Sequence, residues 1–202
     1  GAASIHDEVL AHYQHLATAG VQVVILAGRD AERVQSLAAN GTYDSLQILG
    51  HTHDVGRWMQ AADLLVCRAG ASTLAEMTAL GLPAIVVPWS GAAHDHQAAN
   101  AQVLADVGAC QLLNEVQCAN GRLVHEITTL LADEKRLTSL SQRAFEFGRR
   151  DATDRVVEEV RRHLDHGTSR EALPLYRYWR RWNERIGMAP PPAGPFRHRF
   201  GL

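Results

Sequence analysis

Apolar and polar positions alternate along this chain with two different periods, and each period predicts a type of element. Between Ile5 and Ala17 the apolar residues recur at helical spacing, whereas residues 21–26 (VQVVIL) form a short run typical of a buried strand. The alternation continues to about residue 164. It predicts strands over residues 21–26, 46–49, 62–67, 84–87 and 110–113, and helices over 5–17, 30–39, 55–61, from 72, 95–107, 120–131, 134–147 and 153–164. Such βα alternation predicts an α/β domain over residues 1–164, with a Rossmann-like parallel sheet, flanking helices and right-handed crossovers.

The strongest candidate chemistry lies where the strand 62–67 turns into a helix, at residues 68–76 (RAGASTLAE). Ser72 and Thr73 would stand in the first helical turn, whose N–H groups lack helical partners and favour a phosphate. Glu76, one turn further, could accept two hydrogen bonds from the diol of a ribose. Taken alone, the turn also fits a plain helix cap. A second polar segment, residues 95–100 (DHQAAN), follows the next strand, and open α/β sheets bind ligands at the carboxyl ends of neighbouring strands. Together the two segments predict a nucleotide-sugar site.

Residues 63–110 resemble the C-terminal domain of the MurG-type glycosyltransferases, which belong to glycosyltransferase family 28 and have the GT-B fold. The family pattern is roughly A-D-x-x-x-x-R-x-G-A-x-T-x-x-E, then G-x-P-x-x-x-x-P, then D-H-Q-x-x-N-A. The matching residues are Ala62, Asp63, Arg68, Gly70, Ala71, Thr73, Glu76, Gly81, Pro83, Pro88, Asp95, His96, Gln97, Asn100 and Ala101. The resemblance extends over about residues 1–164. Members of this family transfer N-acetylglucosamine from UDP-GlcNAc to undecaprenyl-diphospho-muramoyl-pentapeptide.

The resemblance implies a set of donor-binding residues. Ala71, Ser72 and Thr73 would lie near the α-phosphate and ribose, and Glu76 would hold the ribose hydroxyls. Gln97 and Asn100 would face the sugar hydroxyls. Thr52 would lie in the segment that offers main-chain groups to uracil, where this chain departs from the family pattern. Secondary candidates for the same site are Gly1, Arg68, Gly70, Asp95 and His96.

Arg68 has two possible roles, since it could orient the turn through backbone carbonyls or contact a phosphate directly. His94 and His96 have H-x-H spacing, but no third ligand with good spacing accompanies them, so no metal and no cofactor is expected. Catalytic residues are not expected either, because the resemblance places the general base in a domain that precedes this one.

The beginning of the chain affects the expected sheet. Gly1-Ala2 aligns with the end of the family's G-G-S-x-G-A loop, which cradles the diphosphate. We therefore expect a fragment that lacks the acceptor domain, the start of this loop and the first strand, and that is inactive alone. The absence of a central strand would leave two neighbouring strands with unpaired backbone groups. The alternative, that Gly1 begins a complete domain, stays open.

Composition narrows the class of partner. A net charge of −2 argues against general nucleic-acid binding, and three cysteines without metal-ligand spacing fit a reducing cytoplasm. Residues 165–202 differ, with seven Arg against three Asp or Glu, several aromatic residues and a Pro-rich stretch. This basic extension could anchor the protein at anionic lipid or pack on the acceptor domain.

The sequence thus predicts the UDP-GlcNAc-binding part of an inverting glycosyltransferase that makes a peptidoglycan precursor. Its acceptor would be lipid-linked and bound by the absent N-terminal domain. The expected location is the cytoplasm, with peripheral contact at the inner face of the cell membrane left open. Two alternatives remain: a related glycolipid glycosyltransferase of the diacylglycerol glucosyltransferase type, and a noncatalytic donor-binding subunit of a split enzyme.

Overall fold

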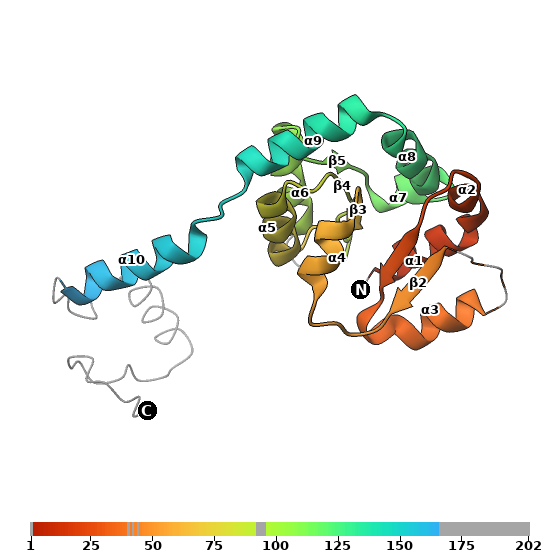
Figure 1. The fold of residues 1–202 in the computed structure, drawn as a ribbon, viewed down its shortest axis with the longest axis horizontal. Helices are drawn as coiled ribbons and strands as arrows, with labels where there is room; N and C mark the ends of the chain where they lie inside the picture. The colour runs from red at the N-terminus through yellow and green to blue at the C-terminus, as the bar shows by residue number, and fades with distance from the viewer. Residues whose placement is uncertain (1, 40, 42, 44, 92–95, 166–202) are drawn as a thin grey trace. The chain divides into compact units, whose positions relative to one another are not determined.

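The computed structural model describes residues 2–39, 41, 43, 45–91 and 96–165 (Figure 1). Residues up to Arg149 form one unit and those from Arg150 a second, and each is described by itself. Of the sequence-based candidates, Gly1, Asp95 and residues 166–202 of the extension lie outside the described residues. The domain boundary expected after residue 164 stays a prediction.

Helices and strands alternate through the first unit. The amino-terminal part contains α1 (Ala3–Ala11), α2 (Tyr13–Thr18), β1 (Val23–Leu26), η1 (Gly28–Asp30), α3 (Ala31–Ala38), β2 (Leu46–Leu49) and α4 (Val55–Ala61). There follow β3 (Leu65–Cys67), α5 (Ala71–Leu80), β4 (Ala84–Val86), α6 (His96–Asp106), β5 (Gln111–Leu112), α7 (Glu115–Cys118), α8 (Arg122–Leu131) and α9 (Glu134–Phe147). The second unit contains α10 (Ala152–Asp165).

The strand pairs among the described residues are all parallel, as predicted. β1 pairs with β2 in the register Val23↔Leu46. β4 lies between β3 and β5, with Val86 opposite Cys67 on one side and Leu112 on the other. Since helices connect successive strands throughout, the α/β class with a Rossmann-like parallel sheet is confirmed (Figure 1).

The strands form two separate sheets, β1–β2 and β3–β4–β5, and no described strand pairs with the outer edge of β1 or of β3. In β1 the N–H groups of Val23 and Ala27 bond toward β2, at Ser45 O and Leu49 O, 2.8 Å each. Because the groups of alternate residues in a strand point to opposite sides, those of Val24 point away from β2. The described strands therefore do not form one continuous sheet, and β1 does not pair with β3.

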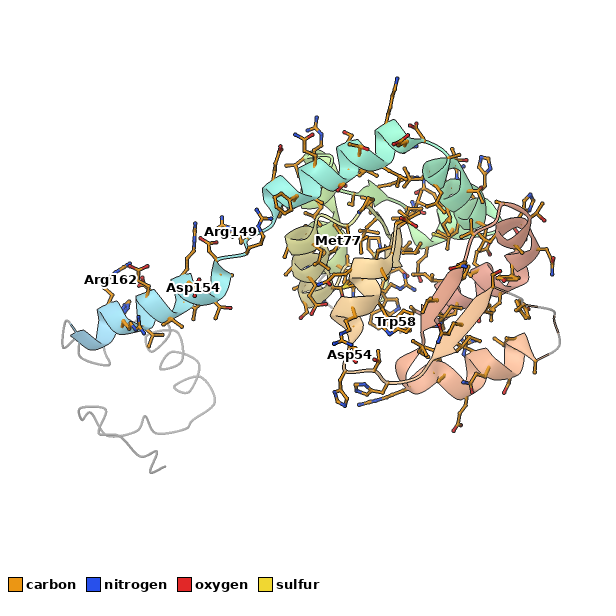
Figure 2. The ribbon with its side chains drawn as sticks, in the orientation of Figure 1. Asp54, Trp58, Met77, Arg149, Asp154 and Arg162 are labelled. Carbon is orange, nitrogen blue, oxygen red and sulfur yellow. The ribbon has the colours of Figure 1, made fainter. Side chains whose placement is uncertain are left out.

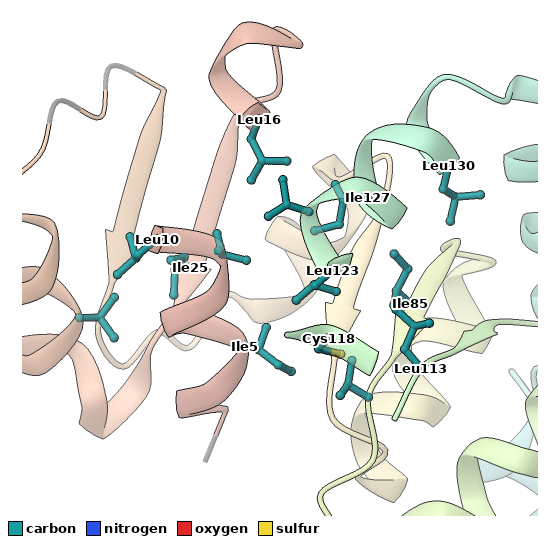
Figure 3. Close-up of a cluster of buried hydrophobic side chains, with 14 of the residues drawn as sticks. Ile5, Leu10, Leu16, Ile25, Ile85, Leu113, Cys118, Leu123, Ile127 and Leu130 are labelled. Carbon is teal, nitrogen blue, oxygen red and sulfur yellow. The ribbon is translucent and has the colours of Figure 1, made fainter. Parts of the chain in front are cut away.

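The two sheets are joined by side-chain packing and not by backbone hydrogen bonds between strands. β4 is buried on both faces: Ile85 lies in a core with residues of β1, α1, α2 and α8, and Val86 in a second core with residues of α5 and α6. Figure 3 shows the first core, in which Ile25 of β1 and Ile85 of β4 are joined through the side chains of the intervening helices, Leu123 and Ile127 among them. The apolar contact across this core holds the β1–β2 sheet beside the three-stranded one.

The position of α5 is fixed at its carboxyl end. Gly81 ends the helix in the left-handed region (φ 65°), and its N–H donates to Thr78 O at 3.1 Å. Ser141 of α9 donates to Gly81 O at 2.7 Å, and Met77 on the inner face of α5 is fully buried (Figure 2). Since this end is packed, the opposite end of α5, which begins at Ala71, is held at the edge of the sheet.

Candidate functional site

The candidate site lies at the carboxyl ends of β3, β4 and β5. Because these strands are parallel, the segments that follow them come out at one edge of the sheet. The segments are residues 68–70 before α5, residues 87–91 before α6, and residues 113–115 at the start of α7. The two polar segments predicted from the sequence therefore occupy the same edge.

The first turn of α5 is open to a ligand. Gly70 caps the helix with extended backbone (φ −68°, ψ 136°), and among the described residues no side-chain cap hydrogen bond is made there. Ser72 is exposed and Thr73 half-buried. An added Cβ on Gly70 would meet only Thr73 Oγ1, at 4.0 Å. The arrangement presents N–H donors at the positive end of a helix dipole, which favours an anion.

Glu76 lies on the exposed side of α5, one turn from this open end. A carboxylate at this position offers two acceptor oxygens to donors that lie beside the first turn. The structure thus brings Glu76 and residues 71–73 together on one helix, as the sequence predicted.

Gln97 and Asn100 bind the two turns that border the site. Gln97 Oε1 accepts a hydrogen bond from the backbone N–H of Trp89 at 3.0 Å, and Asn100 Nδ2 donates to Ala69 O at 3.3 Å. Both side chains therefore lie on the face of α6 that is turned toward the ends of β3 and β4. Their role at sugar hydroxyls stays a prediction, and His96 is exposed at the first position of α6.

Thr52 follows a strand of the other sheet, in the turn between β2 and α4. Its Oγ1 accepts from the N–H of Asp54 at 3.1 Å, immediately before α4 (Figure 2). The His51 and His53 rings lie 5.6 Å apart, on either side of it. Thr52 thus shapes the turn that leads into α4, and its predicted place near uracil stays untested.

Arg68 contacts backbone carbonyls, as expected if its role is to orient the turn. Its Nη1 donates to the carbonyl oxygens of Val87 and Pro88, at 3.2 Å each, so the side chain reaches across the end of β4. Its Nη2 donates to Ser4 Oγ at 2.9 Å and forms a 2.5 Å ion pair with Glu115. The guanidinium thus connects three segments at this edge.

Glu115 is a site residue that the sequence analysis missed. One of its oxygens accepts from Arg68 and from Ser4 Oγ, and the other from the N–H and Oγ of Ser90. The hydrogen bond from the Ser90 hydroxyl, followed by those from Arg68 and Ser4, lowers the pKa of Glu115 to about 2. A signal for its position existed, since Asn114 and Gln117 form a capping box that places Glu115 in the first turn of α7.

Residues 1–156 match the family model described as the glycosyltransferase family 28 C-terminal domain. The chain belongs to this family. The matched range contains the whole edge described above, with the N-terminus of α5, the α6 amides and the Arg68–Glu115 pair.

Similar proteins share one name. A protein of Bacillus licheniformis is 33% identical over 168 residues, which cover 81% of this chain and 46% of that protein. A protein of Nitratidesulfovibrio vulgaris is 36% identical over 159 residues, covering 78% and 44%. Both are named UDP-N-acetylglucosamine–N-acetylmuramyl-(pentapeptide) pyrophosphoryl-undecaprenol N-acetylglucosamine transferase. The predicted resemblance to MurG-type transferases is confirmed.

Among solved structures, the crystal structure of Acinetobacter baumannii MurG matches with a TM-score of 0.65 and 29% identity, covering 80% of this chain and 47% of that one. The family 28 chain therefore spans about half the length of the relatives it matches.

In the part of the chain that the structure describes, no three His, Cys, Asp or Glu side chains gather as metal ligands would. His94, one residue of the H-x-H pair, lies outside that part. None of the described helices is both long and apolar enough to cross a membrane.

Proposed function

We propose that this chain is the donor-binding part of an inverting glycosyltransferase that uses UDP-GlcNAc and acts on a lipid-linked acceptor. The observation that carries the proposal is the uncapped N-terminus of α5, with Glu76 one turn further along the same exposed side. The names of the relatives support N-acetylglucosamine as the sugar and a pyrophosphoryl-undecaprenol compound as the acceptor.

In this proposal the diphosphate binds at the first turn of α5. The amides of residues 71–73 point toward it, and the helix dipole adds a partial positive charge. A ribose attached to the α-phosphate would lie along the exposed side of α5, where both oxygens of Glu76 can accept from its hydroxyls. The turn around Thr52 would offer backbone groups to uracil.

The sugar would lie on the other side of the diphosphate, toward α6. Gln97 and Asn100 each carry a donor and an acceptor, and one of these groups already contacts a turn of the site. The remaining amide groups can pair with sugar hydroxyls, which neutral amides suit better than they suit phosphates.

The reaction would be a displacement at the anomeric carbon. The acceptor hydroxyl forms a bond to that carbon, the bond from the carbon to the diphosphate oxygen breaks, and UDP leaves with the electron pair. Oriented N–H groups that hold the departing charge can stabilise such a transition state by about 3 kcal/mol for each donor. The acceptor site and the general base, which takes the hydroxyl proton, are proposed to lie in a part of the protein beyond these residues. Since the proposed acceptor is a membrane lipid derivative, we place the protein in the cytoplasm, at the inner face of the membrane.

The proposal is tested by replacing Glu76 in the natural-length protein and titrating with UDP in a calorimeter. Glu76→Ala removes a charge-assisted pair of hydrogen bonds to the ribose and should weaken binding by about 1.5–3 kcal/mol. UDP-GlcNAc should lose nearly as much affinity, because both ligands contain the ribose.

A matched control is Glu32→Ala, which removes an exposed carboxylate from the first turn of α3, the helix that follows β1. It should leave both affinities unchanged. If Glu76→Ala binds UDP as tightly as the control does, Glu76 is not part of the site.

A further inference from the structure

Four segments of the chain meet at one carboxylate. Glu115, in the first turn of α7, bonds to Ser4 in the first turn of α1, to Arg68 after β3, and to Ser90 after β4. Ser4 also accepts from Arg68, so the three residues Ser4, Arg68 and Glu115 are bonded in a closed ring. These contacts span 25 to 111 residues of sequence, so the network fixes segments that nothing local would hold together.

The network is poorly explained as a device for stability. The Arg68 and Glu115 side chains are only 14% and 23% exposed, so both charges have lost most of their hydration. Shielded ion pairs of this kind often stabilise a fold less than apolar residues of similar size. Arg68 Nε is moreover buried without a partner among the described residues. The pair is therefore weak evidence for a role in stability, and its effect on the geometry of the surrounding segments is the more informative property.

The terminal nitrogens of Arg68 are also fully engaged, which disfavours direct binding to a phosphate. The two terminal nitrogens of a guanidinium carry four N–H donors. Four bonds are present: Nη1 with Val87 O and Pro88 O, and Nη2 with Ser4 and Glu115. With its charge balanced by Glu115 and these donors in use, Arg68 acts on a ligand only through the segments that it holds.

One of these segments is the first turn of α1. No described side chain caps this helix, and its earliest backbone bonds run from the N–H groups of Ile5 and His6 to Ala2 O. The amides of Ala3 and Ser4 precede these donors and have no partner within the helix. The Arg68–Glu115 pair therefore links one uncapped helix end, at α1, to the turn that leads into another, at α5.

We propose that Arg68 and Glu115 are positioning residues that set the first turn of α1 and the Pro88–Ser90 loop against the first turn of α5, so that both helix ends bind the diphosphate of the donor together. The inference rests on the proposed function and adds to it the residues that align the two turns. The pair contacts the diphosphate only through these turns, and the uridine part of the donor lies outside its influence.

The test compares two ligands that differ only in the diphosphate. UDP and uridine are titrated in a calorimeter against the natural-length protein and its Glu115→Gln and Arg68→Met variants. We expect each variant to bind UDP about tenfold or more weakly, and uridine with less than about a twofold change, because only the diphosphate spans the two turns. The double variant should bind UDP no more weakly than the single variant with the lower affinity, since the two residues act as one unit.

Glu126→Gln is the matched control. Glu126 is also a largely shielded carboxylate of the first unit that accepts a side-chain hydrogen bond, from Gln111 at the opposite end of β5. It should leave the UDP-to-uridine affinity ratio unchanged. If Arg68→Met does not fold, Ser4→Ala is tested in its place, because Ser4 is exposed and its loss removes only the link to α1. The ratio of UDP affinity to uridine affinity should then fall about threefold or more.

Two results separate the inference from the proposed function. If the unmodified protein does not bind UDP, the proposed function fails. If the unmodified protein binds UDP, the positioning role is refuted when Glu115→Gln keeps the wild-type ratio or weakens UDP and uridine equally.

Discussion

Gly148 is a point at which one added methyl group should displace the helix that carries the candidate site. The residue ends α9 with φ −64° and ψ 137°, dihedrals that alanine adopts without strain. An added Cβ would nevertheless lie 2.6 Å from the carbonyl carbon of Thr78 and 2.9 Å from the N of Ala79, and closer still to Thr78 O. All three atoms belong to the backbone of α5, so no side chain can rotate away, and Gly148→Ala must push α9 and α5 apart.

The expected cost follows from these contacts. Overpacking of a well-packed contact costs typically about 1–3 kcal/mol, and three backbone atoms at such distances place this case near 3 kcal/mol. Alanine also restricts the unfolded chain and regains about 0.4–1 kcal/mol. The net loss should therefore be about 2 kcal/mol, which lowers the melting temperature by about 4–8 °C in a protein of this size. Urea unfolding followed by circular dichroism, together with a thermal scan, measures both quantities.

Gly56→Ala is the control, because it makes the same chemical change but should change the free energy of unfolding in the opposite direction. Gly56 lies in α4, is exposed, and an added Cβ would have nothing within 4 Å. Alanine should raise the free energy of unfolding by about 0.5–1 kcal/mol there. If Gly148→Ala is as stable as the unmodified protein, or gains as Gly56→Ala does, the close packing of α9 against α5 is wrong.

Two further predictions concern Gln97 and Glu115. Gln97→Ala should raise the Michaelis constant for UDP-GlcNAc or lower turnover, while inhibition by UDP stays nearly constant. The variant should also discriminate less between UDP-GlcNAc and its C4 epimer. Equal weakening of UDP and UDP-GlcNAc would instead place Gln97 at the nucleotide. The pKa of Glu115 is lowered from 4.5 to about 2 by folding, so its contribution to stability is complete above pH 4.5 and is lost as pH falls through about 2. The difference in unfolding free energy between the unmodified protein and Glu115→Gln should shrink over that interval, and a difference that does not change with pH would refute the assignment.

The sequence predicted well those helices and strands whose bounds are set by residues nearby in the chain. The strand 46–49 and the helices 55–61 and 134–147 have the predicted bounds, since each apolar stripe is flanked by turn residues or a capping Asp. The single helix expected over residues 5–17 is instead two, α1 and α2, separated at His12. The apolar spacing continues through this break, so the pattern of hydrophobic residues could not reveal it.

The candidate site was predictable only in part, for a related reason. The turn at Gly70 and the polar face of α6 could be recognised because their residues are close in sequence and follow strands. Glu115 was missed because its partners Ser4 and Ser90 lie 111 and 25 residues away. Contacts of this kind depend on how the strands are ordered, which local spacing does not encode.

The interruption between β1 and β3 also determines how the first unit should open. The two sheets share a side-chain core but no described strand pair, so the β1–β2 sheet can separate without breaking a strand-to-strand hydrogen bond to β3–β4–β5. In amide hydrogen exchange the unit should therefore behave as two cooperative regions with different opening free energies. Val24 is 41% exposed, and its amide points away from β2, so this amide should exchange from the native state. The amides of β4, whose residues are fully buried, should exchange only after a larger opening. A ligand bound at the carboxyl ends of β3, β4 and β5 should then stabilise that region more than the β1–β2 sheet.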